Sequence, residues 1–128
     1  MPEQRNPDIE IYIKNCELEA VVDWLRGHSK GLELEQRADN HCTMNITFDA
    51  TPVAADFHTK VSGKAWSSLW IKSDASPWAT DLACALSASE SLNTQVRCMA
   101  NSWREDESEI EQWWRIENGE RTLIEWNS

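Results

Sequence analysis

The segment that decides the fold is IEIYIKNCELEAVVDWL, residues 9–25, because it passes from the period of a strand to that of a helix. Ile9, Ile11 and Ile13 alternate with more polar residues, which is typical of a strand with one buried face. Further along, apolar residues follow the i, i+3, i+4, i+7 spacing of a helix that buries one side. These residues are Leu18, Val21, Val22 and Leu25. We therefore expect a strand and then a helix, which Asn15 caps at its N-terminus.

A similar order recurs in the second half of the chain. IYIKN at residues 11–15 precedes the first helix, and LWIKS at residues 69–73 precedes a second predicted helix. Each is an apolar strand that ends in Lys and a small polar residue. The sequence is therefore interpreted as two halves, 9–63 and 64–126, each with a strand, a helix and further strands. A duplication and a chance match both explain this likeness.

The rest of the first half predicts more strands. The first helix is expected to end at Gly27, and the alternating leucines and glutamates of residues 32–35 predict the next strand. Residues 42–48 alternate strongly and predict another strand. The stretch 49–63 is ambiguous, and we expect at most a short edge strand at Phe57–Val61.

The second half predicts a strand, a helix and three shorter strands. AWSSLWIK, residues 65–72, predicts a strand with Trp66, Ser68 and Trp70 on one face. Ser76 followed by Pro predicts the start of the second helix.

The end of the second helix and the C-terminal strands follow. Asn93 is the expected helix end, and residues 95–99 predict a short strand with Val96 and Cys98 inward. Asn118 and Gly119 lie between two apolar runs, which is the strongest short-range indication of a hairpin. A two-residue turn would place two glutamates opposite each other, and a longer loop with a glycine bulge would separate them.

These elements predict an α+β fold made of one domain, residues 1–128, with residues 1–8 frayed. We expect two helices packed on one face of a largely antiparallel or mixed sheet. The other face of the sheet would be open to solvent or to a partner.

The expected strand order resembles the paired modules, each a strand, a helix and three strands, of the glyoxalase and bleomycin-resistance family. The resemblance lies in the predicted order of elements and not in a sequence motif. That family holds metal ligands on strands around a cup. The residues that this resemblance nominates here are His58 and Glu125.

Charge and cysteine content restrict the function. The net charge is −10, which argues against binding a phosphate backbone or an anionic membrane. It is compatible with a basic protein partner, and it is also explained by solubility alone. No apolar run approaches the ~20 residues that span a bilayer. The four cysteines form no CxxC pair and are interpreted as small buried residues in a reducing cytoplasm.

Motifs that carry chemistry are missing from the sequence. It contains no HExxH, CxxC, glycine-rich phosphate loop or GxSxG elbow. The histidines, His28, His41 and His58, stand in loop-like contexts without a sequence partner that would orient them. We therefore name no catalytic residue, metal ligand or cofactor, and lean against an enzyme.

The binding candidates are aromatic and acidic. The chain has eight tryptophans. Trp113 and Trp114 are adjacent on one strand, so one of them must lie on the face away from the helices, where it would cover the sheet or bind a partner. Trp66 and Trp70 would extend that surface into an indole shelf if their strand lay beside the C-terminal hairpin. The acidic candidates are Glu105, Asp106, Glu107 and Glu109.

Three classes of function follow from these observations. The first is a non-enzymatic interaction module that binds a basic protein, and small acidic bacterial immunity proteins look broadly similar in composition. The second is a small-molecule-binding protein or cup-shaped enzyme built from paired modules. The third is a structural subunit that self-associates through the open sheet face to form a homo-oligomer.

Overall fold

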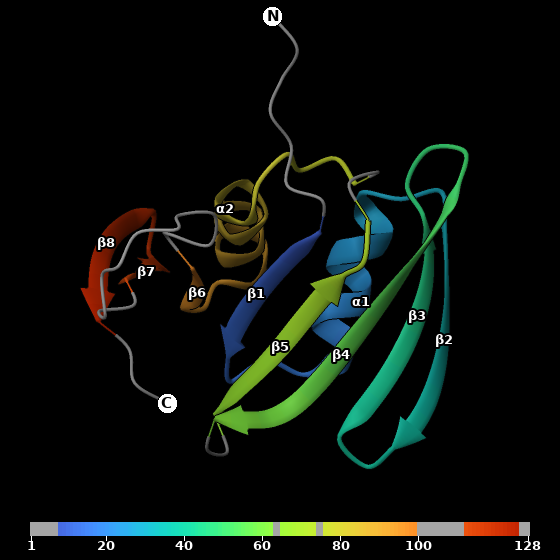
Figure 1. The fold of residues 1–128 in the computed structure, drawn as a ribbon, viewed down its shortest axis with the longest axis horizontal. Helices are drawn as coiled ribbons and strands as arrows, with labels where there is room; N and C mark the ends of the chain where they lie inside the picture. The colour runs from blue at the N-terminus through green and yellow to red at the C-terminus, as the bar shows by residue number, and fades with distance from the viewer. Residues whose placement is uncertain (1–7, 63–64, 74–75, 100–111, 126–128) are drawn as a thin grey trace, which may run out of the picture.

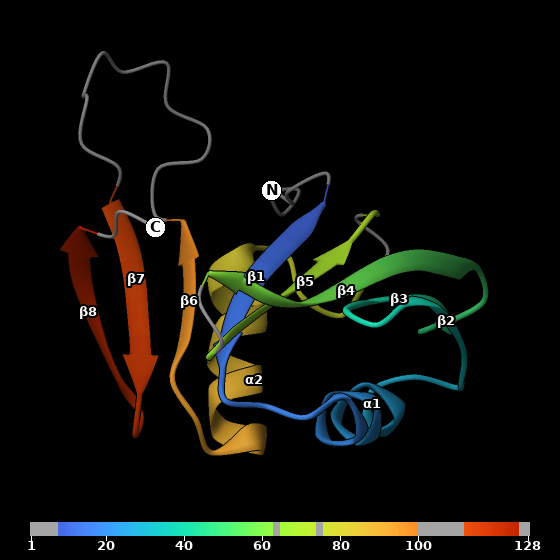
Figure 2. The same cartoon turned by 90° about the horizontal axis from the view of Figure 1, so that it is seen from below.

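The sheet of this protein is antiparallel throughout, and both helices pack on one of its faces (Figures 1 and 2). The computed structural model describes residues 8–62, 65–73, 76–99 and 112–125. The predicted α+β class is confirmed. The elements are β1 (Ile9–Lys14), α1 (Leu18–Gly27), β2 (Gly31–Ala38), β3 (His41–Thr47), β4 (Pro52–Ser62), β5 (Trp66–Ile71), α2 (Asp81–Leu92), β6 (Val96–Met99), β7 (Gln112–Glu117) and β8 (Glu120–Glu125).

The two halves of the chain share the centre of one eight-stranded sheet. Its strand order is β2-β3-β4-β5-β1-β6-β7-β8. Strand β5 of the second half lies between β4 and β1, and β1 of the first half lies between β5 and β6. The predicted halves therefore interlock through the β1–β5 pair and do not form separate sheets.

The register of the central pair places the core on the helix side. Ile9 is opposite Ile71, and Ile11 is opposite Leu69, and all four side chains are fully buried. Helix α2 lies against β1, β6 and β7, while α1 lies beside α2 and reaches toward β2 (Figure 2). The Trp24 indole of α1 donates a hydrogen bond to the hydroxyl of Ser87 on α2, at 3.1 Å, which joins the two helices.

Strand β4 differs from the prediction. It is eleven residues long and lies inside the sheet between β3 and β5, so the expected short edge strand at Phe57–Val61 is wrong. Ala54 and Ala55 point to opposite faces, and this pair of small residues hides the apolar alternation in the sequence. Pro52 is tolerated because it is the first residue of the strand.

Both predicted helix starts are also wrong. Asn15 has a left-handed backbone, with φ 47°, and Glu17 occupies the N-cap position of α1 without a side-chain cap bond. Helix α2 begins later than expected, with the Thr80 hydroxyl accepting a hydrogen bond from the Ala83 amide at 3.1 Å. The residue that follows Pro77 is Trp78, whose ring packs 5.1 Å from that of Trp24. The backbone at Trp78 is not helical, and α2 begins only after Thr80.

The ends of the helices and the hairpin follow the sequence closely. Helix α1 ends at Gly27 and α2 is closed by Asn93 in a left-handed conformation. Asn118 and Gly119 form a two-residue turn, with φ values of 55° and 79°. Glu117 does lie opposite Glu120, and Arg115 offsets that repulsion with an ion pair of 3.0 Å to Glu117.

The central pair should dominate the stability of the fold. Leu69 is fully buried opposite Ile11, so Leu69→Ala is expected to lower the free energy of unfolding by about 2–5 kcal/mol. Leu123 on edge strand β8 is 46% exposed, and Leu123→Ala should cost less than about 1 kcal/mol. Urea unfolding followed by tryptophan fluorescence measures both, and equal losses would contradict this view of the core.

Candidate functional site

The face of the sheet opposite the helices, called here the open face, carries polar and aromatic side chains. Cross-strand partners share a face, so the register identifies its members. One row runs across most of the sheet from β3 to β8. It consists of His41, His58, Ser68, Tyr12, Arg97, Arg115 and Thr122.

A hollow of about 280 Å³ lies on the open face over β2, β3, β4 and the end of β5. We call it the β2–β5 hollow. The small side chain of Ala54 leaves room at its floor. Its charged and polar lining residues are Glu33, Glu35, Arg37, Thr43, Asn45, Asp56 and Lys72.

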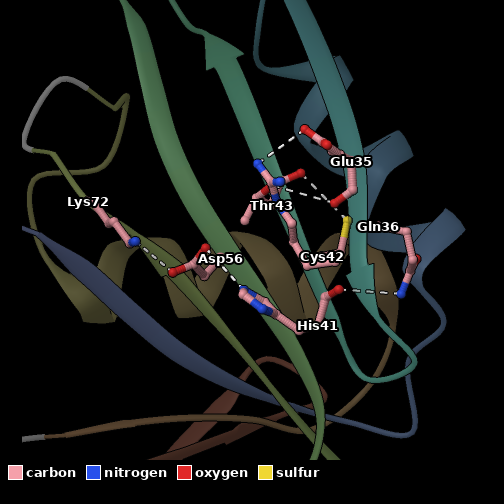
Figure 3. Close-up of polar contacts among 8 residues, drawn as sticks. Glu35, Gln36, His41, Cys42, Thr43, Asp56 and Lys72 are labelled. Carbon is pink, nitrogen blue, oxygen red and sulfur yellow. Dashed lines mark hydrogen bonds and ion pairs between the residues drawn. The ribbon is translucent and has the colours of Figure 1, made fainter.

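Asp56 on β4 is the buried charge of this hollow. It is 8% exposed, and its two carboxylate oxygens lie 2.7 Å from Lys72 Nζ and 3.4 Å from His41 Nε2 (Figure 3). Burial alone raises the pKa of the Asp56 carboxyl, but the hydrogen bonds and charges of Lys72 and His41 outweigh it, and the pKa lies below its ordinary value. Asp56 is therefore a fixed carboxylate whose oxygens are already engaged.

Aromatic rings extend the Asp56 contacts at both ends. The His41 ring stacks on the His58 ring with centroids 4.1 Å apart. On the other side, Lys72 Nζ lies 4.7 Å from the centre of the Trp70 ring, a cation–π contact. These contacts hold the three rings in place beside Asp56 and Lys72.

The outer rim of the hollow is formed by β2, which lies at the end of the sheet. Glu33 and Glu35 are exposed there, and both project onto the open face opposite Asn45 and Thr43. Arg37 forms an ion pair of 3.1 Å with Glu35 and donates a hydrogen bond to the Thr43 hydroxyl at 3.1 Å. Within the described ranges Glu33 has no ion-pair partner, so the rim offers a carboxylate that a ligand can approach.

The structure divides the predicted tryptophan sites between the two faces. Trp113 lies on the open face, where its ring contacts Tyr12 edge-on with centroids 5.4 Å apart. Trp114 lies on the helix face and packs against the core. The expectation that one of the two faces away from the helices is confirmed.

Trp66 and Trp70 share the open face as predicted, but they do not continue into the hairpin. Strands β1 and β6 lie between β5 and β7, so β5 is not beside the C-terminal hairpin and the predicted indole shelf does not form. Trp66 is buried under the guanidinium of Arg97, 4.6 Å from its ring centre. Trp70 is 37% exposed and contacts Lys72, which lines the β2–β5 hollow, and it is the predicted tryptophan that a partner can reach most easily.

The other predicted residues are not brought together. His58 lies on β4 and Glu125 on β8, with four strands between them. In the described part of the chain no group of three His, Cys, Asp or Glu residues could hold a metal ion. Glu105, Asp106, Glu107 and Glu109 lie outside the described residues.

The cysteines are free thiols. Cys42, Cys84 and Cys98 are buried as expected, whereas Cys16 is half-buried. Burial raises the pKa of the Cys98 thiol to about 12, so it stays protonated at neutral pH and is a poor nucleophile.

Sequence patterns alone did not indicate the residues that line the β2–β5 hollow. The sequence predicted that Glu33 and Glu35 lie on a strand, but only the strand order shows that this strand is at the edge of the sheet. Asp56 and Lys72 are sixteen positions apart, and only the β4–β5 pairing brings their side chains together.

Comparison of the chain with protein-family models, with curated proteins and with solved structures finds no match. In the part of the chain that the structure describes, no helix has both the length and the apolar character needed to cross a membrane.

The Asp56 contacts should make stability depend on pH. Asp56→Asn is expected to lower the free energy of unfolding at pH 7 by about 1–3 kcal/mol, because Lys72 and His41 lose a charged acceptor. The pKa of Asp56 is lower in the folded protein than its ordinary value, so this contribution is complete above that value. It is lost as the pH falls through the folded pKa.

Urea unfolding at neutral and acidic pH measures this effect. The difference in the free energy of unfolding between wild type and Asp56→Asn should shrink toward zero at acidic pH. Asp49→Asn is the control, because the Asp49 side chain is 94% exposed in its ion pair with Lys30 and should contribute little. A difference between wild type and Asp56→Asn that stayed constant with pH would rule out this linkage.

Proposed function

We propose that this protein is a non-enzymatic interaction module that binds a basic protein partner at the acidic rim of the β2–β5 hollow. The observation that carries the proposal is the pair of exposed carboxylates, Glu33 and Glu35, on the edge strand of a sheet face opposite both helices. The partner supplies Lys or Arg side chains to this rim. A reducing cytoplasm is the compartment we propose, which the free thiols support.

The charge of the chain and the position of Trp70 support this function. A net charge of −10 attracts a basic partner over a distance and raises the rate of encounter. Trp70 is exposed beside Lys72, a lining residue of the hollow, and its indole donates a hydrogen bond to Asp8 at 2.8 Å. Ordered tryptophans of this kind are common among the residues that dominate protein interfaces.

The shape and lining of the hollow favour a protein over a small molecule. Small-molecule sites are usually enclosed, mostly apolar and about 300–1,000 Å³ in volume. The β2–β5 hollow has about 280 Å³ and is lined mainly by charged and polar side chains. An immunity protein that covers the basic cleft of a toxin is one form of such a module.

A capture experiment with matched variants tests the proposed function. Wild type, Glu33→Gln/Glu35→Gln and Asp23→Asn/Glu90→Gln are immobilised and exposed to lysate of the source organism at low and high salt. The rim variant should lose at least about tenfold of its affinity for a basic partner, and binding should weaken with salt. The control removes the same charge from exposed positions on α1 and α2 and should bind like wild type.

Two outcomes would overturn the proposal. Equal binding by the rim variant and by wild type would show that Glu33 and Glu35 are not the contact. A partner that binds equally well at high salt would contradict the electrostatic basis.

The acidic segment remains a second proposed contact for the same partner. Neutralising Glu105, Asp106, Glu107 and Glu109 together tests it in the same assay. Unchanged affinity would confine the interaction to the rim.

A further inference from the structure

We infer that the partner binds as an added β-strand along β2, through an extended segment in which basic residues alternate with apolar ones. This inference rests on the proposed function and specifies the partner's local structure. It depends on the free edge of the sheet, on the two faces of β2 and on the charge pattern that distinguishes β2 from the other edge.

Strand β2 presents a long edge. It is the end strand of the sheet (Figure 1). It is eight residues long, and every residue except Leu32 is exposed. The outer backbone groups of an end strand form a template to which another strand can hydrogen-bond. Extended peptides commonly bind in this way, with main-chain bonds giving affinity and alternate side chains giving specificity.

The two faces of β2 differ in chemistry. Glu33 and Glu35 project onto the open face, whereas Leu32 and Leu34 lie opposite Ile46 and Met44 on the helix face. Leu34 remains 44% exposed, so it offers apolar area to a neighbour. An added strand would be stabilised by basic residues beside the glutamates and apolar residues beside Leu34, because adjacent cross-strand pairs interact directly.

The same carboxylates disfavour pairing with a second copy of this chain in the register centred on Leu34. An antiparallel pair of β2 strands centred on Leu34 would place Glu33 of each copy against Glu35 of the other. Like charges at directly opposite positions destabilise a sheet. That register is therefore disfavoured, whereas a strand with basic residues at both positions would be favoured there.

The charge pattern is confined to one of the two sheet edges. Strand β8 carries Thr122 and Ile124 at its open-face positions, with Glu120 beside the turn. It lacks the two successive carboxylates of β2. The β2–β5 hollow also lies next to β2 and gives a long Lys or Arg side chain room to reach Asn45 and Thr43.

Synthetic peptides test the inference. The probe is Lys-Val-Lys-Val-Lys-Val-Lys, and its isomer Lys-Lys-Lys-Lys-Val-Val-Val has the same composition and charge. Fluorescence anisotropy gives the affinities, and hydrogen exchange reports on the backbone amides of β2. The alternating peptide should bind at least about tenfold more tightly than the isomer and slow the exchange of β2 amides.

Charge reversal supplies the matched control. Glu33→Lys/Glu35→Lys should lose the alternating basic peptide and gain binding to Glu-Val-Glu-Val-Glu-Val-Glu. Asp23→Lys/Glu90→Lys makes the same change in net charge on α1 and α2 and should retain the wild-type preference.

The outcomes separate this inference from the proposed function. One outcome is that both basic isomers bind equally, lose binding in Glu33→Lys/Glu35→Lys and leave the β2 amides unprotected. This outcome overturns strand addition but leaves an acidic rim that binds basic partners. Binding of neither peptide also overturns strand addition, while the capture experiment decides the proposed function independently.

Discussion

The pairing of β1 with β5 is the interaction on which the rest of the structure depends. These strands come from opposite halves of the chain, and their fully buried aliphatic side chains, with Ile11 opposite Leu69, form the centre of the core. The β4 and β6 strands attach to either side of this pair, and α2 packs beneath it. Loss of the central pair would therefore separate two smaller sheets, neither of which has a complete core.

A sheet that is covered on one face has to stabilise polar groups on the other. Here Asp56 becomes nearly buried on the open face, and Lys72 and His41 compensate for its lost hydration. These contacts are satisfied within the fold. On β2, by contrast, the exposed Glu35 pairs with Arg37, and Glu33 has no ion-pair partner in the described part of the chain. The difference between Asp56 and Glu33 is thus one of position: an inner strand buries its charge, and an edge strand presents it.

Much of the fold could be predicted from local patterns. The alternating isoleucines of β1, the helical spacing in α1 and the Asn118–Gly119 turn are determined by short-range sterics and periodicity, and the structure has all three. The full length of strand β4 was not predicted, because its two adjacent alanines interrupt the alternation of apolar and polar residues. The start of α2 also differs from the prediction: Thr80 caps the helix, and Trp78 before it packs against Trp24, a residue far away in the sequence.

The sequence by itself determined the types of most elements, the buried face of each and the acidic character of the chain. These properties depend on residue type and on spacing within one element, so no distant contact is needed to predict them. Only the tertiary structure decided the strand order. The strand order in turn places β2 at the edge, brings Asp56 and Lys72 together as an ion pair and buries Trp66 and Trp113. Those features depend on which strands pair with each other. Backbone hydrogen bonds are the same for almost every residue type, so the sequence of one strand says little about which strand lies beside it.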